Sequence, residues 1–447
     1  MNRYFPFLFL TLLVSICSYA QSPPPLKISD TYEEPKNPNE VDQLEWQNQP
    51  QGLQIAICST NERFDRGRVP EIKSFQEISN QAWRGERVSA QMVLWSNDVF
   101  NTVSINMSEF KSSEGQVLPS NAAKVRFEKY VITDEFAEGC GHRKPEDFSA
   151  SLVSDALDNV SNFIIKARET RPVWISVDVP QNARPGLYTS TIDVKVQEGE
   201  RKQFIYSLEV LPTVLPDVSE WKFHLDLWQN PYAVARYHNV KPWSDRHWNY
   251  LTPLMKRLAD SGQKVITASI NKRPWGGQTY DQFESMIVWK KNKDGQWSYD
   301  YQIFDQWVQF MMDLGIKKQI SCYSMVPWGN ELYYFAEKQN TELKITAEPG
   351  SSDYENIWSP FLKDFKKHLQ EKGWNNITRI AMDERGPKEM KAMLDLLNKY
   401  APEFGISFAD NHKSYKKYPE VLKDLSVGFE SSIDENDLIE RKSKGYV

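Results

Sequence analysis

The sequence predicts an N-terminal antiparallel β-sandwich followed by an incomplete α/β barrel with about six of the eight strand–helix units. Residues 51–216 contain several runs in which apolar and polar residues alternate, as in half-buried strands, and no long amphipathic helix. Residues 217–447 alternate short apolar runs with amphipathic helices, which is typical of a parallel sheet. Pro212 and Pro216 separate the two patterns, because proline interrupts strand pairing. An open six-stranded sheet is the alternative for the second half.

Residues 1–20 have the composition of an export signal. Arg3 supplies a positive charge, residues 5–16 are apolar, and the segment ends in a small-residue cleavage site at Ala20. The apolar run is too short for a stable membrane span. We therefore expect a periplasmic or secreted protein, with a lipoprotein anchored at Cys17 as the less favoured alternative. Residues 21–50 are rich in Pro, Asn, Asp and Glu and predict a flexible lead.

Composition and cysteine usage exclude several classes of function. The net charge of −6 disfavours nucleic acid and anionic membranes as partners. Cys58, Cys140 and Cys322 remain after the signal, and their number and spacing fit neither a disulfide framework nor a zinc site. We expect buried thiols, with a Cys58–Cys140 disulfide as the alternative. Because Cys140-Gly-His142 has no partner cluster, we predict no metal. The sequence has no glycine-rich loop that would hold a phosphate, and we predict no cofactor.

In the sandwich, each predicted strand follows from its alternation of apolar and polar residues. Residues 198–200 form a turn that predicts one long hairpin. The predicted strands are residues 53–57, 88–94, 125–131, 173–179, 185–196 and 202–211.

In the second half, apolar runs predict strands, and capping residues and glycines bound the helices. The predicted strands are residues 223–228, 264–270, 319–325, 378–384, 405–410 and 425–430. The predicted helices are residues 243–260, 304–314, 353–371, one beginning at Pro387 and one near Asp434. Asp294-Gly295 predicts an inserted hairpin of residues 286–289 and 297–301. A barrel of six strands would have two open edges, so we expect a fragment or a truncated product.

The ends of the predicted strands carry the candidate functional residues. In a barrel the carboxyl ends of all strands meet at one mouth. Aromatic rings stack on the apolar face of a sugar, and amides and carboxylates bind its hydroxyl groups, so a carbohydrate is the expected partner; each tryptophan can alternatively belong to the core. The candidates are Trp228, Gln229, Asn230, Asn271, Trp275, Tyr323, Trp328, Asn330, Asp383, Glu384, Asp410 and His412.

Asp383 and Glu384 end a buried strand and are the candidate catalytic residues. The alternative is that the pair caps the next helix and pairs with Arg385. Separate nucleophile and acid carboxylates normally come from different strands on the two sides of a sugar. An adjacent pair fits substrate assistance better, with one carboxylate orienting a 2-acetamido group and the other acting as acid and base.

Several longer stretches carry a family resemblance: residues 225–231, 242–245, 274–281, 321–328 and Ile380-Ala-Met-Asp-Glu-Arg385. With the sandwich before them, they resemble glycoside hydrolase family 123, the β-N-acetylgalactosaminidases. The resemblance implies an exo-acting, retaining mechanism through an oxazolinium intermediate. Asp383 then matches the acetamide-orienting carboxylate and Glu384 the general acid/base. It also implies closing strands beyond the end of this chain. A non-catalytic carbohydrate-binding protein on a degenerate barrel is the alternative.

Overall fold

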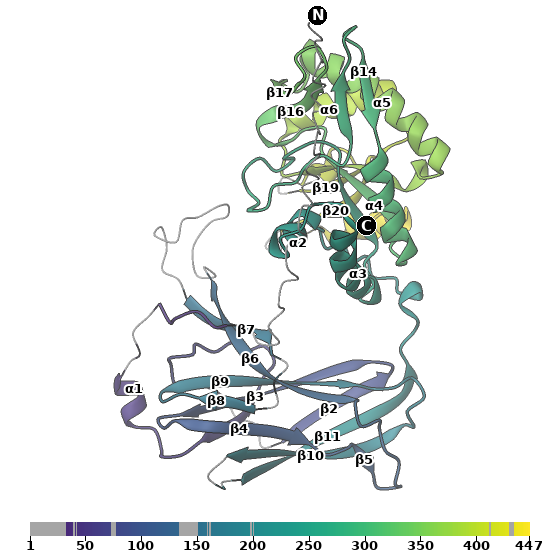
Figure 1. The fold of residues 1–447 in the computed structure, drawn as a ribbon. Helices are drawn as coiled ribbons and strands as arrows, with labels where there is room; N and C mark the ends of the chain where they lie inside the picture. Colours follow the sequence, from purple (N-terminus) through teal and green to yellow (C-terminus); the bar gives the residue numbers. More distant parts are fainter. Residues whose placement is uncertain are drawn as a thin grey trace, which may run out of the picture.

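The computed structural model describes residues 33–38, 41, 43–72, 77–133, 151–158, 160, 162–196, 199, 201–410, 413–428 and 433–447. Figure 1 shows a β-rich part followed along the chain by an α/β part. Within the described ranges, no helix combines the length and apolar character needed to cross a membrane.

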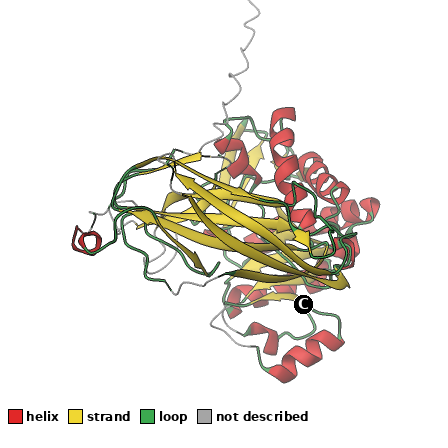
Figure 2. Ribbon diagram, turned by 90° about the horizontal axis from the view of Figure 1, so that it is seen from below, coloured by secondary structure: helices red, strands yellow, loops and turns green. Residues whose placement is uncertain are grey.

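The β-rich part is a sandwich of two sheets, seen edge-on in Figure 1 and from below in Figure 2. The first sheet has the order β1 (Gln54–Cys58), β3 (Arg87–Ser96), β9 (Glu169–Asp178), β6 (Ala123–Thr133) and β7 (Ser151–Leu157). The second has the order β2 (Ile78–Arg84), β11 (Arg201–Val214), β10 (Gly186–Val196), β4 (Phe100–Met107) and β8 (Asn162–Ile165), with β5 (Lys111–Ser112) beside β10. The strand pairs are antiparallel except β2 and β11, which are parallel.

The alternation that predicts these strands corresponds to burial in the sandwich. On β10, Tyr188, Ile192 and Val194 are buried in the core between the two sheets. The predicted hairpin is confirmed, since Gly186 pairs with Val210 in one continuous ladder of β10 and β11. Apolar residues at every second position therefore form one core between two sheets.

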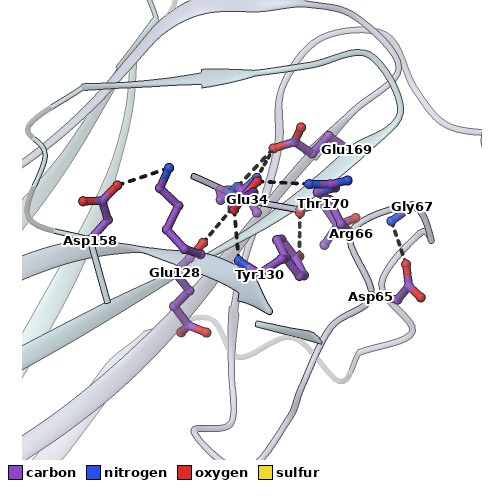
Figure 3. A network of polar contacts seen from close by, with 11 residues as sticks. Glu34, Asp65, Arg66, Gly67, Glu128, Tyr130, Asp158, Glu169 and Thr170 are labelled. Atoms are coloured by element: carbon purple, nitrogen blue, oxygen red, sulfur yellow. Dashed lines mark hydrogen bonds and ion pairs between the residues drawn. The ribbon is translucent and has the colours of Figure 1, made fainter. Parts of the chain in front are cut away.

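Part of residues 21–50, which the composition predicts as a flexible lead, contacts the sandwich. The helix α1 (Gln43–Gln47) buries Trp46 completely, and its indole N–H donates to the carbonyl of Gly67 at 2.9 Å. Further upstream, the Glu34 carboxylate accepts from Arg171 Nη2 at 3.0 Å and from Arg66 Nη1 at 3.2 Å (Figure 3). A buried indole and a paired carboxylate hold a segment whose composition alone suggests disorder.

The α/β part contains a parallel sheet of the order β12 (Val265–Ser269), β15 (Gln319–Tyr323), β18 (Thr378–Asp383), β19 (Gly405–Ala409) and β20 (Leu422–Ser426). Strand order follows chain order, as expected for successive strand–helix units. The helices are α2 (Pro231–Tyr237), α3 (Asp245–Asp260), α4 (Gln302–Asp313), α5 (Ser352–Lys372), α6 (Pro387–Tyr400) and α7 (Glu435–Ser443). Among these helices only α2 is not predicted from the sequence, and β20 begins three residues earlier than predicted.

The predicted first strand, residues 223–228, is not a regular strand. Only Leu225 makes a β-bridge, to Gln263 beside β12. Side-chain amides replace the rest of the ladder: Gln263 Oε1 accepts from the Leu227 backbone N–H at 3.0 Å, and Gln229 Oε1 accepts from the Thr267 N–H at 2.9 Å. The segment runs along β12 without the backbone pairing that defines a strand.

The parallel sheet is strongly curved. The Gln319 side chain on β15 donates to Asp424 on β20, although β18 and β19 lie between these strands in the sheet. In a flat sheet these strands would lie about 14 Å apart, too far for one side-chain hydrogen bond. The sheet therefore curls around its interior, and its five strands replace the predicted count of six.

A second, four-stranded sheet is inserted between the units of the parallel sheet. Its order is β14 (Trp297–Asp300), β13 (Val288–Lys291), β16 (Glu331–Ala336) and β17 (Thr341–Thr346). The predicted hairpin is confirmed as β13 and β14. The sequence analysis assigned no element to β16 and β17, which pair with each other and with β13.

Candidate active site

Asp383 and Glu384 lie where β18 leaves the parallel sheet. Asp383 is the last residue of β18 and pairs with Ala409 of β19, whose carbonyl accepts from the Glu384 N–H at 2.9 Å. Glu384 has φ of 49°, in the left-handed region that non-glycine residues rarely adopt. This turn ends the alternation of side chains along the strand, so two successive carboxylates need not face opposite sides.

The alternative role of the pair, as a cap of the following helix, does not match the geometry. The residue at the N-cap of α6 is Gly386, which makes no side-chain cap hydrogen bond, and Pro387 fills the first helical position. The N-cap position of α6 is therefore taken by Gly386 and not by Asp383 or Glu384.

The two carboxyl groups occupy different environments. Asp383 is half-buried, whereas Glu384 is exposed. Burial, together with the charge of Glu384, raises the pKa of Asp383 to about 6, and the indole N–H of Trp328 acts in the opposite direction. The Trp328 Nε1 atom is buried and meets full hydrogen-bond geometry with no described residue, so its effect on Asp383 is that of a nearby dipole.

Three of the predicted residues form an aromatic wall beside this pair. The rings of Trp228, Trp275 and Tyr323 have centroids 4.7 to 5.3 Å apart in each pairing. Trp275 and Tyr323 are buried, whereas Trp228 is 43% exposed. The Asp383 charge contributes, after burial and Asp226, to the raised pKa of Tyr323, so the wall borders the carboxylate. One exposed indole supported by two buried rings can stack on the apolar face of a sugar.

Three other predicted residues use their side chains to hold the backbone. The Gln229 amide is buried and bonds to backbone groups of Leu227 and Thr267. Asn230 caps α2 by accepting from the Tyr232 N–H at 3.1 Å. Asp410 is buried and accepts from Ser414 Oγ at 3.1 Å and from the Ser414 N–H. These hydrogen bonds all lie within the α/β part of the chain.

Other candidates are placed as follows. Asn271 is fully buried and its Oδ1 accepts from the Ser324 N–H at 3.3 Å. His412 lies outside the described residues, as do Cys140 and His142. Cys58 and Cys322 are buried free thiols. Among the described residues, no group of three or more His, Cys, Asp or Glu side chains could hold a metal ion.

Arg385, predicted only as a possible ion-pair partner of the carboxylates, contacts two residues of the Trp328 turn. Its guanidinium lies 5.5 Å from the centre of the Trp328 ring, and its Nη2 donates to Asn330 Oδ1 at 3.1 Å. The position directly after the carboxylate pair was the only available signal, because both contacts join segments more than 50 residues apart in the chain.

A hollow of about 790 Å³ lies on the sandwich, away from the carboxylate pair. Several charged residues of its lining pair with one another: Glu34 bonds to Arg66 and Arg171, and Lys129 lies 3.3 Å from Asp158 (Figure 3). We therefore place the candidate chemistry at β18, where a carboxyl group of raised pKa lies beside an exposed ring.

Comparisons with known proteins identify the family of the chain. Two family profiles match: "Glycoside hydrolase 123, catalytic domain" over residues 228–447 and "Glycoside hydrolase 123 N-terminal domain" over residues 57–196. A solved family 123 glycoside hydrolase from Clostridium perfringens, studied for glycolipid glycan hydrolysis, is 32% identical with a TM-score of 0.80. That match covers 89% of this chain and 71% of the Clostridium protein. The chain belongs to glycoside hydrolase family 123.

Membership of family 123 makes the chain a glycosidase that acts on carbohydrate. No curated protein sequence matches it significantly. A PapD-like domain of human CEP192 is 10% identical with a TM-score of 0.18, and covers 32% of this chain and 92% of its own. The periplasmic chaperone SfaE is 12% identical with a TM-score of 0.18, and covers 37% of this chain and 60% of its own. Scores this low carry no argument about this family 123 chain.

Proposed function

We propose that the chain is an exo-acting β-N-acetylgalactosaminidase that releases terminal β-linked N-acetylgalactosamine with retention of configuration. One observation carries the proposal: Asp383, with its pKa raised to about 6, and Glu384 follow one another at the end of β18, beside the aromatic wall. The family resemblance implies the sugar, and the glycolipid glycans hydrolysed by the Clostridium relative make glycan or glycolipid head groups the proposed substrates.

The adjacency of the two carboxylates favours substrate assistance. A protein nucleophile and an acid on opposite sides of a sugar are about 5 Å apart or more and come from separate positions around the site. Here the 2-acetamido oxygen of the substrate attacks the anomeric carbon while Glu384 protonates the departing glycosidic oxygen. Asp383 accepts a hydrogen bond from the acetamide N–H and stabilises the positive charge of the oxazolinium ring that forms.

The second half of the reaction returns the enzyme to its first state. Glu384, now ionised, takes a proton from a water molecule, which attacks the anomeric carbon and opens the oxazolinium ring. Two successive inversions at this carbon give net retention. Asp383 must stay ionised throughout, whereas Glu384 must begin protonated. The exposed position of Glu384 gives it access to the leaving group and to water.

The test is hydrolysis of an aryl β-N-acetylgalactosaminide, with the matching β-N-acetylglucosaminide alongside. We expect release from the first substrate, and loss of at least about a hundredfold in kcat for Glu384→Gln. Glu371→Gln, on the exposed face of α5, is the matched control and should leave kcat unchanged. Hydrolysis by Glu384→Gln at the parent rate would contradict the role of Glu384. Binding of the sugar without turnover by the parent would favour the non-catalytic alternative.

We also propose that residues 1–20 direct export, on the basis of their composition. The N-terminus of the mature protein, determined by mass spectrometry after expression in a Gram-negative host, should be Gln21. A retained or lipid-modified N-terminus would contradict this cleavage.

A further inference from the structure

Arg385 contacts both ends of the short turn formed by Trp328, Gly329 and Asn330. The guanidinium lies over the Trp328 ring with its carbon 5.5 Å from the ring centre, within the range of a cation–π contact. Its Nη2 donates to the Asn330 side chain at 3.1 Å. Planar stacking and a directed hydrogen bond are both properties of arginine that lysine does not share.

The rest of the surroundings leaves Trp328 little freedom. Its backbone N–H donates to the Pro274 carbonyl at 2.9 Å. A Cβ atom at Gly276 would lie only 3.3 Å from the Trp328 Cβ, so the neighbouring loop packs closely against this side chain. Arg385 covers a face of the indole and thereby limits its rotation.

The orientation of this indole matters because its N–H affects the carboxylate of Asp383. The Trp328 Nε1 atom is buried, and its dipole lowers the pKa of Asp383 against the effects of burial and Glu384. A buried N–H directed at a carboxylate favours the ionised form of that carboxylate. Among the described residues, Glu384 and Tyr323 interact electrostatically with Asp383, and Arg385 lies two residues further along the chain.

We propose that Arg385 is a positioning residue that holds the Trp328 ring so that its indole N–H faces the Asp383 carboxylate. Its effect on catalysis rests on the function proposed above, since Asp383 must be ionised to orient the acetamide. Arg385 has an indirect role in this proposal. It acts through Trp328.

The kinetic test uses Arg385→Lys, Trp328→Phe and the double variant. Arg385→Lys keeps the positive charge but removes the planar guanidinium that covers the indole and bonds to Asn330. Trp328→Phe keeps an aromatic ring but removes the indole N–H. We expect each to lower kcat about tenfold or more with KM within about threefold, because misplacement of an orienting group mainly affects the reacting complex. The double variant should be no worse than Trp328→Phe alone, because both changes remove one interaction.

Arg236→Lys is the matched control, because Arg236 lies 5.0 Å from the Tyr280 ring centre and pairs with Asp281, away from Trp328. It should keep parent kcat. Parent activity in Arg385→Lys, or losses that multiply in the double variant, would overturn the proposal.

A second readout needs no turnover. The difference in Tm between a protein and its Asp383→Asn version, followed against pH, reports the titration of Asp383. The midpoint of this titration curve should move to higher pH in Arg385→Lys and in Trp328→Phe, and stay unchanged in Arg236→Lys. An unchanged midpoint in Arg385→Lys would overturn the inference. A shifted midpoint in a chain that hydrolyses neither sugar would support the positioning role and reject only the proposed function.

Discussion

His224 Nε2 lies 3.6 Å from Asp424 Oδ1, which joins the irregular segment before α2 to β20, the last strand of the parallel sheet. Asp424 also accepts from Ser407 Oγ at 2.9 Å and from Gln319. One buried carboxylate thus connects side chains from four segments inside the curved sheet. Burial alone raises the pKa of Asp424, but His224, Gln319 and Ser407 together hold it below its usual value.

Removing this carboxylate should destabilise the α/β part. Asp424→Ala leaves Gln319 and Ser407 buried without their acceptor, so the free energy of unfolding should fall by about 2–4 kcal/mol in urea denaturation. Asp395→Ala, which breaks an exposed pair with Lys391 on α6, should cost less than about 1 kcal/mol. Equal effects of the two variants would show that the Asp424 cluster is not a structural centre.

The activity should depend on the ionisation of Asp383. Because its pKa is raised to about 6 and it must be ionised to orient the acetamide, kcat/KM should fall as pH drops through about 6. Burial, with the charge of Asp424, raises the pKa of Asp226 to about 6 as well. Asp226→Asn is therefore the control and should leave the acid limb in place. If the acid limb disappears in Asp226→Asn, the limb reports the ionisation of Asp226 and not that of Asp383.

Asp383→Asn should abolish most activity and stabilise the fold at neutral pH. A carboxyl group whose folded pKa exceeds its unfolded value binds more protons in the folded state, so stability falls as pH rises from about 4 to about 6. The neutral amide avoids this loss, which we place at about 1–2 kcal/mol for a half-buried group. Calorimetry should show a higher Tm than the parent at pH 7.5 and little difference at pH 3.5. A lower Tm at pH 7.5 would contradict the unfavourable burial of the ionised Asp383 carboxylate.

Trp228 should contribute to sugar binding through its exposed face. An aromatic contact is worth about 0.5–1.5 kcal/mol, so Trp228→Ala should raise KM about two- to twelvefold and change kcat less. Trp83→Ala is the matched control, because Trp83 on β2 is 40% exposed but belongs to the sandwich. An unchanged KM in Trp228→Ala would show that the exposed face of Trp228 does not bind the sugar.

Glu34 should stabilise the sandwich through its two arginine partners. Burial raises its pKa, but hydrogen bonds and charge from Arg171 outweigh this, so the folded pKa lies below the usual value. The stabilisation is present above about pH 4.5 and is lost as pH falls through the folded pKa. Glu34→Ala should lower the Tm at pH 7, whereas exposed Glu33→Ala should not. Equal Tm values for both variants would mean that the lead does not dock in solution.

Periodicity and caps were enough to place most of the elements. The α3 helix begins after Ser244, whose hydroxyl accepts from the His247 N–H, and α5 ends at Gly373 with φ of 73°, as glycine at this position permits. The predictions of strands failed where contacts between distant segments, and not the local sequence pattern, decide the structure. Residues 223–228 look like a strand but take their hydrogen bonds from glutamine side chains, and β16 and β17 form only by joining an existing hairpin.

The sequence by itself determined the two-part architecture, the carboxylate pair and the family resemblance, because each is written in local patterns of a few to a few tens of residues. Only the tertiary structure decided which predicted residues surround Asp383. It brought Trp228, Trp275, Tyr323 and Trp328 together, turned Gln229, Asn230 and Asp410 to backbone groups, and placed Arg385 on Trp328. Burial, ring stacking and pKa shifts depend on side chains far apart in the chain, so they arise only once the sheet has curved and brought its strand ends together.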